Sequence, residues 1–128
     1  MTVSSFRDLR VWQAAMDLIT RVYEITEDFP QRETYGLASQ MRRAAISIAS
    51  NIAEGHAREH TKEYLHHVSV AQGSLAELET QLEASARLTF VRAEQIEETL
   101  QQIKSLRMQL FALRNSLSKR ICPPSPDP

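Results

Sequence analysis

Apolar residues recur at intervals of three and four along four segments of this sequence, which is the spacing of one face of an α-helix. The segments run from about residue 6 to 29, 33 to 55, 61 to 88 and 93 to 119. Short connections make consecutive helices antiparallel neighbours. The pattern therefore predicts an all-α protein, an up-down-up-down antiparallel four-helix bundle in one domain, residues 1–120. We expect residues 121–128, which hold four of the five prolines, to be a Pro-rich tail without structure.

Local signals suggest where the helices begin and end. Ser5, with Asp8 three residues later, is typical of an N-cap for the first helix. Pro30 ends that helix, and Gly55 suits the C-cap of the second. A three-helix protein, with the second and third segments fused through Gly55, is disfavoured because glycine is unfavourable inside a helix.

Apolar side chains cover more of the first two helices than one core stripe requires. The first helix carries a stripe of Leu9, Trp12, Met16, Ile19 and Tyr23, and a second apolar surface of Val11, Ala15, Leu18, Val22 and Ile25. On the second helix, apolar and small residues cover about half of the circumference. Deep burial in the bundle is one explanation. We favour the other, a subunit interface in a homo-oligomer.

Small and polar residues interrupt the second and third helices, where Leu or Ala would form a better helix. One line along the second helix holds Gln40, Arg43, Ser47, Asn51 and Glu54. In a hairpin turning near Arg58, residues whose numbers add to about 117 come level.

That register places Arg43 opposite Ser74 and Gln40 opposite Glu77. Gly73 would allow close approach of the two backbones, and Glu77 would accept hydrogen bonds from Arg43. We favour a structural polar network over a binding groove at this position.

Composition and charge narrow the function classes. The 128 residues are 42% hydrophobic, with three Gly and a net charge of -1. The single Cys122 suits a reducing compartment, and no apolar run reaches the length of a membrane span. We expect a cytoplasmic protein with no membrane association.

The bundle topology would separate the charges into a basic end and an acidic end. Repeated around an oligomer, the basic end would hold phosphates, although complementation of the helix dipoles explains part of the asymmetry. The candidate nucleic-acid-binding residues are Arg7, Arg10, His56, Arg58, His60, Lys62, Arg114, Lys119 and Arg120. The acidic end would collect Glu24, Glu27, Asp28, Glu33, Glu83, Glu94, Glu97 and Glu98.

Catalytic and metal-binding motifs are weak. The run from His56 through Glu59 to His60 has the H-x-x-E-H spacing of a zinc peptidase, but Gly55 should break the helix there and no third ligand is indicated. The adjacent His66 and His67 point to different faces. We expect no enzyme activity, no metal and no cofactor.

Several motifs agree in order and spacing with one known family. They are Phe6-Arg-Asp-Leu9-Arg-Val-Trp12-Gln13, Phe29-Pro30, Tyr35-Gly36-Leu37, Gln40-Met-Arg42-Arg43-Ala44, Ser47-Ile48, Asn51-Ile-Ala-Glu54-Gly55 and Gly73-Ser74-Leu75 with Glu77-Leu78. The sequence resembles the four-helix bundle proteins encoded in intervening sequences of bacterial 23S rRNA genes. That family is related to the accessory variability proteins of diversity-generating retroelements.

The resemblance implies a bundle that assembles as a ring, typically a homopentamer, without enzymatic activity. In retroelement relatives the ring binds a reverse transcriptase and nucleic acid. This chain departs from those basic proteins in its net charge of -1, and in having Gln72 where relatives often place a basic residue. Two functions remain open, a nucleic-acid-binding accessory protein or a protein-interaction scaffold with no nucleic-acid role.

Overall fold

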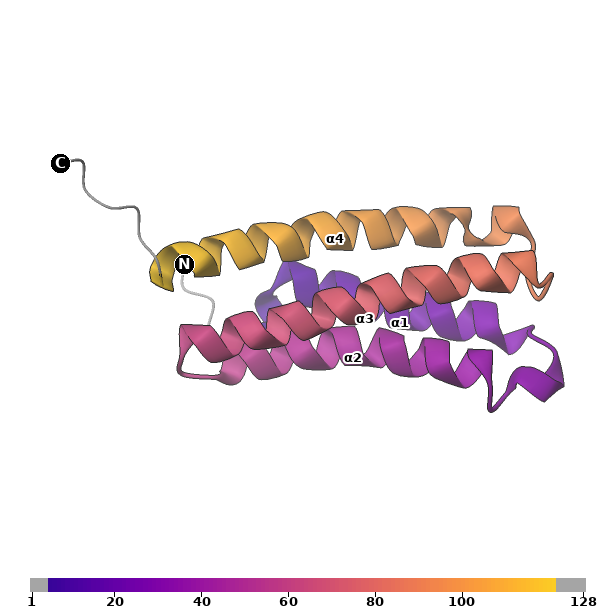
Figure 1. Ribbon diagram of the computed structural model, residues 1–128, viewed down its shortest axis with the longest axis horizontal. Coiled ribbons are helices and arrows are strands. Elements are labelled where there is room, and N and C mark those ends of the chain that lie inside the picture. Colours follow the sequence, from indigo (N-terminus) through magenta and orange to yellow (C-terminus); the bar gives the residue numbers. More distant parts are fainter. Residues whose placement is uncertain (1–4, 122–128) are drawn as a thin grey trace.

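Four long helices run alternately up and down and pack side by side, as Figure 1 shows for the computed structural model, which describes residues 5–121. They are α1 (Arg10–Glu27), α2 (Leu37–Ala57), α3 (Thr61–Arg87) and α4 (Ala93–Ile121). Short 3-10 helices, η1 (Phe6–Asp8) and η2 (Gln31–Glu33), precede α1 and α2. The predicted all-α four-helix bundle is confirmed.

The core lies on the axis between the helices and is almost entirely aliphatic. Its largest fully buried side chains are Leu18, Val22, Met41, Ile48, Ile52, Leu75, Leu78, Leu82, Ile103, Leu106, Leu110 and Leu117. At about 25 cal/mol per Å² of apolar surface removed from water, these side chains are the main source of stability. None of the helices in residues 5–121 is long and apolar enough to cross a membrane.

The start of the first helix differs from the prediction. The Ser5 hydroxyl accepts a hydrogen bond from the Arg7 N–H at 3.2 Å and so caps η1, not α1. Leu9 then adopts an extended conformation, and α1 begins at Arg10 with no side-chain cap. Ser5 is thus an N-cap, but of a single 3-10 turn, and within the described residues no hydrogen bond to the Asp8 carboxylate completes a capping box.

The bounds of the second helix also differ at both ends. Its start lies at Leu37, four residues later than predicted, because η2 and a turn intervene and the Glu33 carboxylate accepts from the Leu37 N–H at 3.1 Å. Gly55 is not its C-cap, since α2 continues to Ala57 and no glycine in the described residues has a positive φ. At the end of α4, Ile121 is helical, while the rest of the predicted tail lies outside the described residues.

The predicted faces of α1 are exchanged. The core side is the second apolar surface, which includes Ala15, Leu18 and Val22, whereas Met16 is 40% exposed and Tyr23 is 41% exposed. On α2 the broad apolar cover is explained by burial within the bundle, because Ala38, Met41, Ala44, Ala45, Ile48, Ala49 and Ile52 are all buried. Its apolar breadth therefore does not by itself indicate a subunit interface.

Candidate functional site

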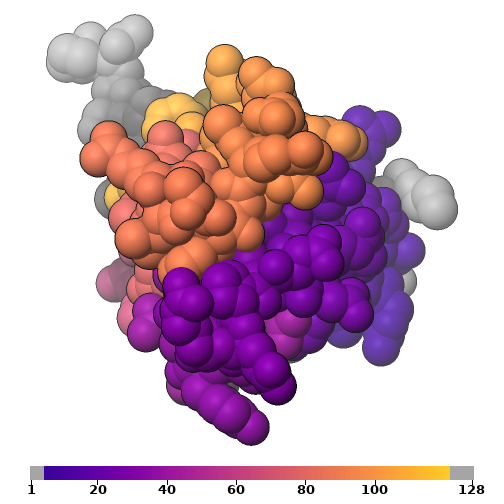
Figure 2. All heavy atoms as spheres, turned by 90° about the vertical axis from the view of Figure 1, so that its right-hand side faces the viewer, coloured from indigo at the N-terminus to yellow at the C-terminus, as the bar shows by residue number. Residues whose placement is uncertain are grey.

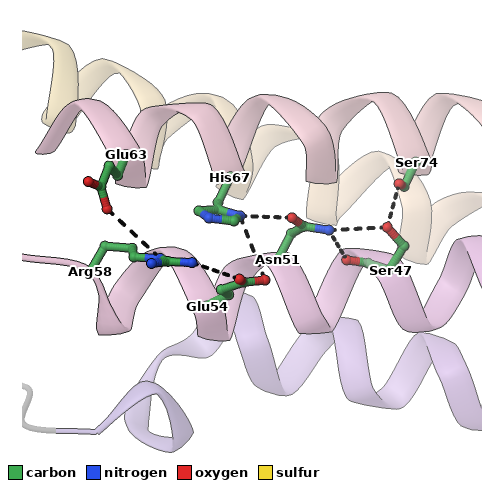
Figure 3. Close-up of polar contacts among 7 residues, drawn as sticks. All are labelled: Ser47, Asn51, Glu54, Arg58, Glu63, His67 and Ser74. Atoms are coloured by element: carbon green, nitrogen blue, oxygen red, sulfur yellow. Dashed lines mark hydrogen bonds and ion pairs between the residues drawn. The ribbon is translucent and has the colours of Figure 1, made fainter. Parts of the chain in front are cut away.

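A ladder of polar side chains joins α2 to α3 (Figure 3). The hydroxyls of Ser47 and Ser74 lie 2.9 Å apart, and the Asn51 amide donates to the Ser47 carbonyl at 2.8 Å. The Asn51 Oδ1 is 2.9 Å from Nδ1 of His67. Because the amide nitrogen of Asn51 already donates to Ser47, its oxygen must accept, and Nδ1 of His67 carries the proton. The ladder fixes which residues of the two helices come level.

The ladder continues toward the turn between α2 and α3. Glu54 lies 4.0 Å from His67 and 2.9 Å from Arg58, which also reaches Glu63 at 3.9 Å. Beside it, His56 Nδ1 is 3.3 Å from the Tyr64 hydroxyl. Burial raises the pKa of that hydroxyl, an effect that the nearby Arg120 partly opposes, so Tyr64 is protonated and can donate to His56 at neutral pH.

The predicted partner of Ser74 is wrong by one helical turn, whereas Asn51 and His67, whose numbers add to 118, fit the predicted register. Ser47, not Arg43, is opposite Ser74. The glycine that α3 packs against is Gly55, where an added Cβ would lie 2.9 Å from both His67 and Tyr64, whereas nothing lies within 4 Å of a Cβ on Gly73. This contact between Gly55 and two large side chains of α3, which sequence spacing could not reveal, adds to the ladder in holding the register.

Only part of the predicted structural network forms. Ser47, Asn51, Glu54 and Ser74 belong to the ladder. Gln40, Arg43 and Glu77 instead line a groove of about 600 Å³ between α2 and α3, and within residues 5–121 no hydrogen bond or ion pair joins Arg43 to Glu77.

Gln81 also lines this groove and was missed by the sequence analysis. It is 8% exposed, and its buried Oε1 has no hydrogen-bond partner among the described residues. A glutamine on a helix ordinarily lies at the surface, so only the packing of α3 could reveal it.

The predicted basic residues gather at one end of the bundle. The start of α1, the turn between α2 and α3 and the last turns of α4 lie together at the left of Figure 1. Figure 2 faces the opposite end, which is formed by the α1–α2 and α3–α4 connections and holds most of the acidic residues named above.

The basic residues differ in exposure and in whether they already form an ion pair or hydrogen bond, and so in their availability to a ligand. Arg58 is held by Glu54 and Glu63, and His56 is half-buried against Tyr64. The exposed remainder that forms no ion pair within residues 5–121 comprises Arg7, Arg10, His60, Lys62, Arg114, Lys119 and Arg120. Acids at the same end are Asp8, Glu54, Glu59 and Glu63.

The H-x-x-E-H run does not lie on one helix. His56 lies in α2, while His60 is the residue that precedes α3. Within the part of the chain that the structure describes, no three His, Cys, Asp or Glu side chains gather to hold a metal ion.

Comparison with known proteins identifies the family. Residues 7–112 match the 23S rRNA-intervening sequence proteins. The chain belongs to this family.

A solved structure supports the fold of this 23S rRNA-intervening sequence family member. It is a protein of unknown function from the S23 ribosomal protein family of Bacteroides thetaiotaomicron, with a TM-score of 0.73 and 19% sequence identity. The similarity covers 81% of this chain and 97% of that one. No match was found among curated proteins. The resemblance drawn from the helix motifs is thus confirmed at the level of family and fold.

Proposed function

We propose that this protein is a non-catalytic homo-oligomer that binds nucleic acid through the basic end of its bundle. The observation that supports this most is the charge of α4. From residue 99 to residue 121 the helix has five Lys or Arg residues and no acid. Three of these cations, Arg114, Lys119 and Arg120, are exposed where α4 meets the other basic segments.

Helix dipoles alone account for only part of this arrangement. A dipole favours cations in the last turn of a helix, and its influence falls off within that turn. Arg107 is paired with Glu79 of α3, but Lys104 lies more than four turns before the end of α4 and forms no ion pair within residues 5–121, so neither the dipole nor a partner accounts for it. Binding of nucleic-acid phosphates would explain this cation, because each phosphate that a Lys or Arg neutralises releases counterions and so favours binding.

Assembly would strengthen the weak positive electrostatic potential at the basic end of a single chain. The outer side of α1 and the adjoining part of α2 expose Met16, Tyr23 and Ile46, each about two-fifths exposed, and Trp12 and Ile19 are half-buried beside them. Arg42 stacks over the Tyr23 ring at 4.7 Å, which places these parts of α1 and α2 side by side. A second copy on this surface would align basic ends, and the family resemblance favours a pentameric ring.

Salt-dependent binding tests the proposal. Fluorescence anisotropy with labelled RNA and DNA should show affinity that falls steeply between about 50 mM and about 200 mM salt. Replacing Arg114, Lys119 and Arg120 together by Gln should weaken binding. The slope of log K against log salt should fall by roughly 0.7 to 0.9 for each phosphate that the variant no longer neutralises.

A matched variant controls for net charge. Replacing Arg32, Arg87 and Arg92, at the acidic end, by Gln changes the charge of the protein equally and should leave the slope unaltered. No binding by the parent protein even at low salt would overturn the proposal.

A protein-interaction scaffold is the second candidate. The groove between α2 and α3 favours it, because Arg43, Glu77 and the side-chain carbonyl of Gln81, which has no partner within residues 5–121, offer polar groups that a partner chain could satisfy. A protein partner without any nucleic-acid binding would distinguish this function from the first.

A further inference from the structure

The outer surface of α4 carries two apolar side chains between basic ones. Lys104, Met108, Phe111, Asn115 and Lys119 follow one another at intervals of four, three, four and four, so they share one face of the helix, called here the α4 stripe. The stripe is roughly 22 Å long at 1.5 Å per residue. Met108 is 67% exposed and Phe111 is 58% exposed, in the middle of a regular helix.

Bundle packing does not explain these two side chains. The core positions of α4 are Ile103, Leu106, Leu110 and Leu117, on the opposite side of the helix. Single exposed apolar residues are common on proteins, so exposure alone indicates nothing. What distinguishes the α4 stripe is that its apolar centre lies within the 23 residues, 99–121, that contain cations and no acid.

The cations near the apolar centre are available to a ligand. Arg107 forms an ion pair with Glu79 of α3 and is therefore occupied. Lys104, Arg114 and Lys119 are exposed and form no ion pair within residues 5–121. They lie on both sides of Phe111 along the helix, about one to two turns away.

The chemistry of the α4 stripe favours one occupant. An anionic membrane surface or a docking helix would require a broad apolar face, and the stripe offers two apolar side chains. A duplex has its bases stacked inside and would use the cations but not the aromatic ring. Single-stranded nucleic acid uses both, because its phosphates pair with Lys and Arg while an unstacked base lies on an aromatic ring.

We propose that the α4 stripe binds single-stranded nucleic acid, with one base stacked on Phe111. Met108 packs against the neighbouring base, and Lys104, Arg114 and Lys119 contact the flanking phosphates. This inference rests on the proposed function and specifies its ligand. It extends the binding surface from the basic end along α4, away from the α1–α2 surface that we assign to assembly.

The test compares Phe111→Ala with the parent protein on a short labelled single strand of RNA or DNA and on the matching duplex. Loss of one stacked base should weaken single-strand binding roughly 5- to 150-fold and leave duplex binding nearly unchanged. Phe111→Trp, which keeps a stacking ring, should retain single-strand binding. Leu88→Ala, at the acidic end and 55% exposed, is the matched control and should change neither affinity.

The outcomes separate this inference from the function on which it rests. If Phe111→Ala binds single strands as tightly as the parent while the Arg114, Lys119 and Arg120 variant loses binding, the basic end stands and stacking on Phe111 is wrong. Equal loss on the duplex also overturns stacking. Absence of all binding at low salt overturns both. Phe111 is exposed, so unfolding curves and oligomeric state should match those of the parent.

Discussion

The interface between α2 and α3 and the outer face of α4 use their non-apolar residues in opposite ways. Along α2–α3, the hydroxyls of Ser47 and Ser74 bond to each other, and Asn51 bonds to His67. On α4, Lys104 and Lys119 face solvent and have no partner within residues 5–121. One region satisfies its polar groups inside the protein, and the other presents them outward.

The comparison shows that the α2–α3 interface fixes how two helices are aligned, whereas the outer face of α4 is available to bind a ligand. Hydrogen bonds between two helices have a narrow range of distances, so the ladder allows one alignment of α2 against α3. The core side of α4 is aliphatic, and aliphatic contacts are non-directional. The outer face of α4 therefore has no part in fixing the fold and is free to carry a binding surface.

The largest expected effect separates the two sides of α4. Leu106 is 1% exposed, so Leu106→Ala should lower the free energy of unfolding by about 2–5 kcal/mol, because it removes buried apolar surface and leaves a cavity. Met108→Ala, two residues away and 67% exposed, should change it by less than about 0.5 kcal/mol. Urea unfolding followed by circular dichroism measures both. Equal losses would mean that Met108 is buried against another subunit.

The next effect concerns two glycines of α2 and α3. Replacing each by alanine should change the free energy of unfolding in opposite directions. Gly55→Ala puts a Cβ 2.9 Å from the Cβ of His67, which cannot rotate away, and should destabilise by about 1–3 kcal/mol despite the better helix propensity of alanine. Gly73→Ala meets nothing within 4 Å and should stabilise by about 0.4–1 kcal/mol. A shift of both melting temperatures in the same direction would contradict the packing assigned to Gly55.

The smallest effect tests the ladder itself. Ser47→Ala, Ser74→Ala and the double variant form a thermodynamic cycle whose coupling energy should be about 0.5–1.5 kcal/mol, the value of one hydrogen bond. Thermal or urea unfolding of the four proteins gives the coupling directly. A coupling near zero would show that these hydroxyls bond to water and that the ladder does not hold the register.

Much of the candidate site could be predicted from local sequence, and the rest could not. The sequence indicated that Gln40 and Arg43 of α2 face residues 74–77 of α3, and it placed the basic residues at one end. It did not reveal the bonded partners. Sliding one helix along the other by one turn leaves the same faces in contact, so helical spacing alone cannot tell whether Arg43, as predicted, or Ser47, as observed, lies opposite Ser74. Phe111 was not singled out, although its exposure agrees with its position away from the core-facing line of Leu106, Leu110 and Leu117.

The sequence by itself determined the four helices and their antiparallel order, because helical periodicity and turn residues are local properties, and its motifs indicated the family. Only the tertiary structure decided which of two apolar stripes on α1 is buried, and that Gly55 lies against Tyr64 and His67 of α3. The reason is physical. A helix with two apolar stripes is equally regular with either one inward, and only the shape of the neighbouring helices distinguishes them.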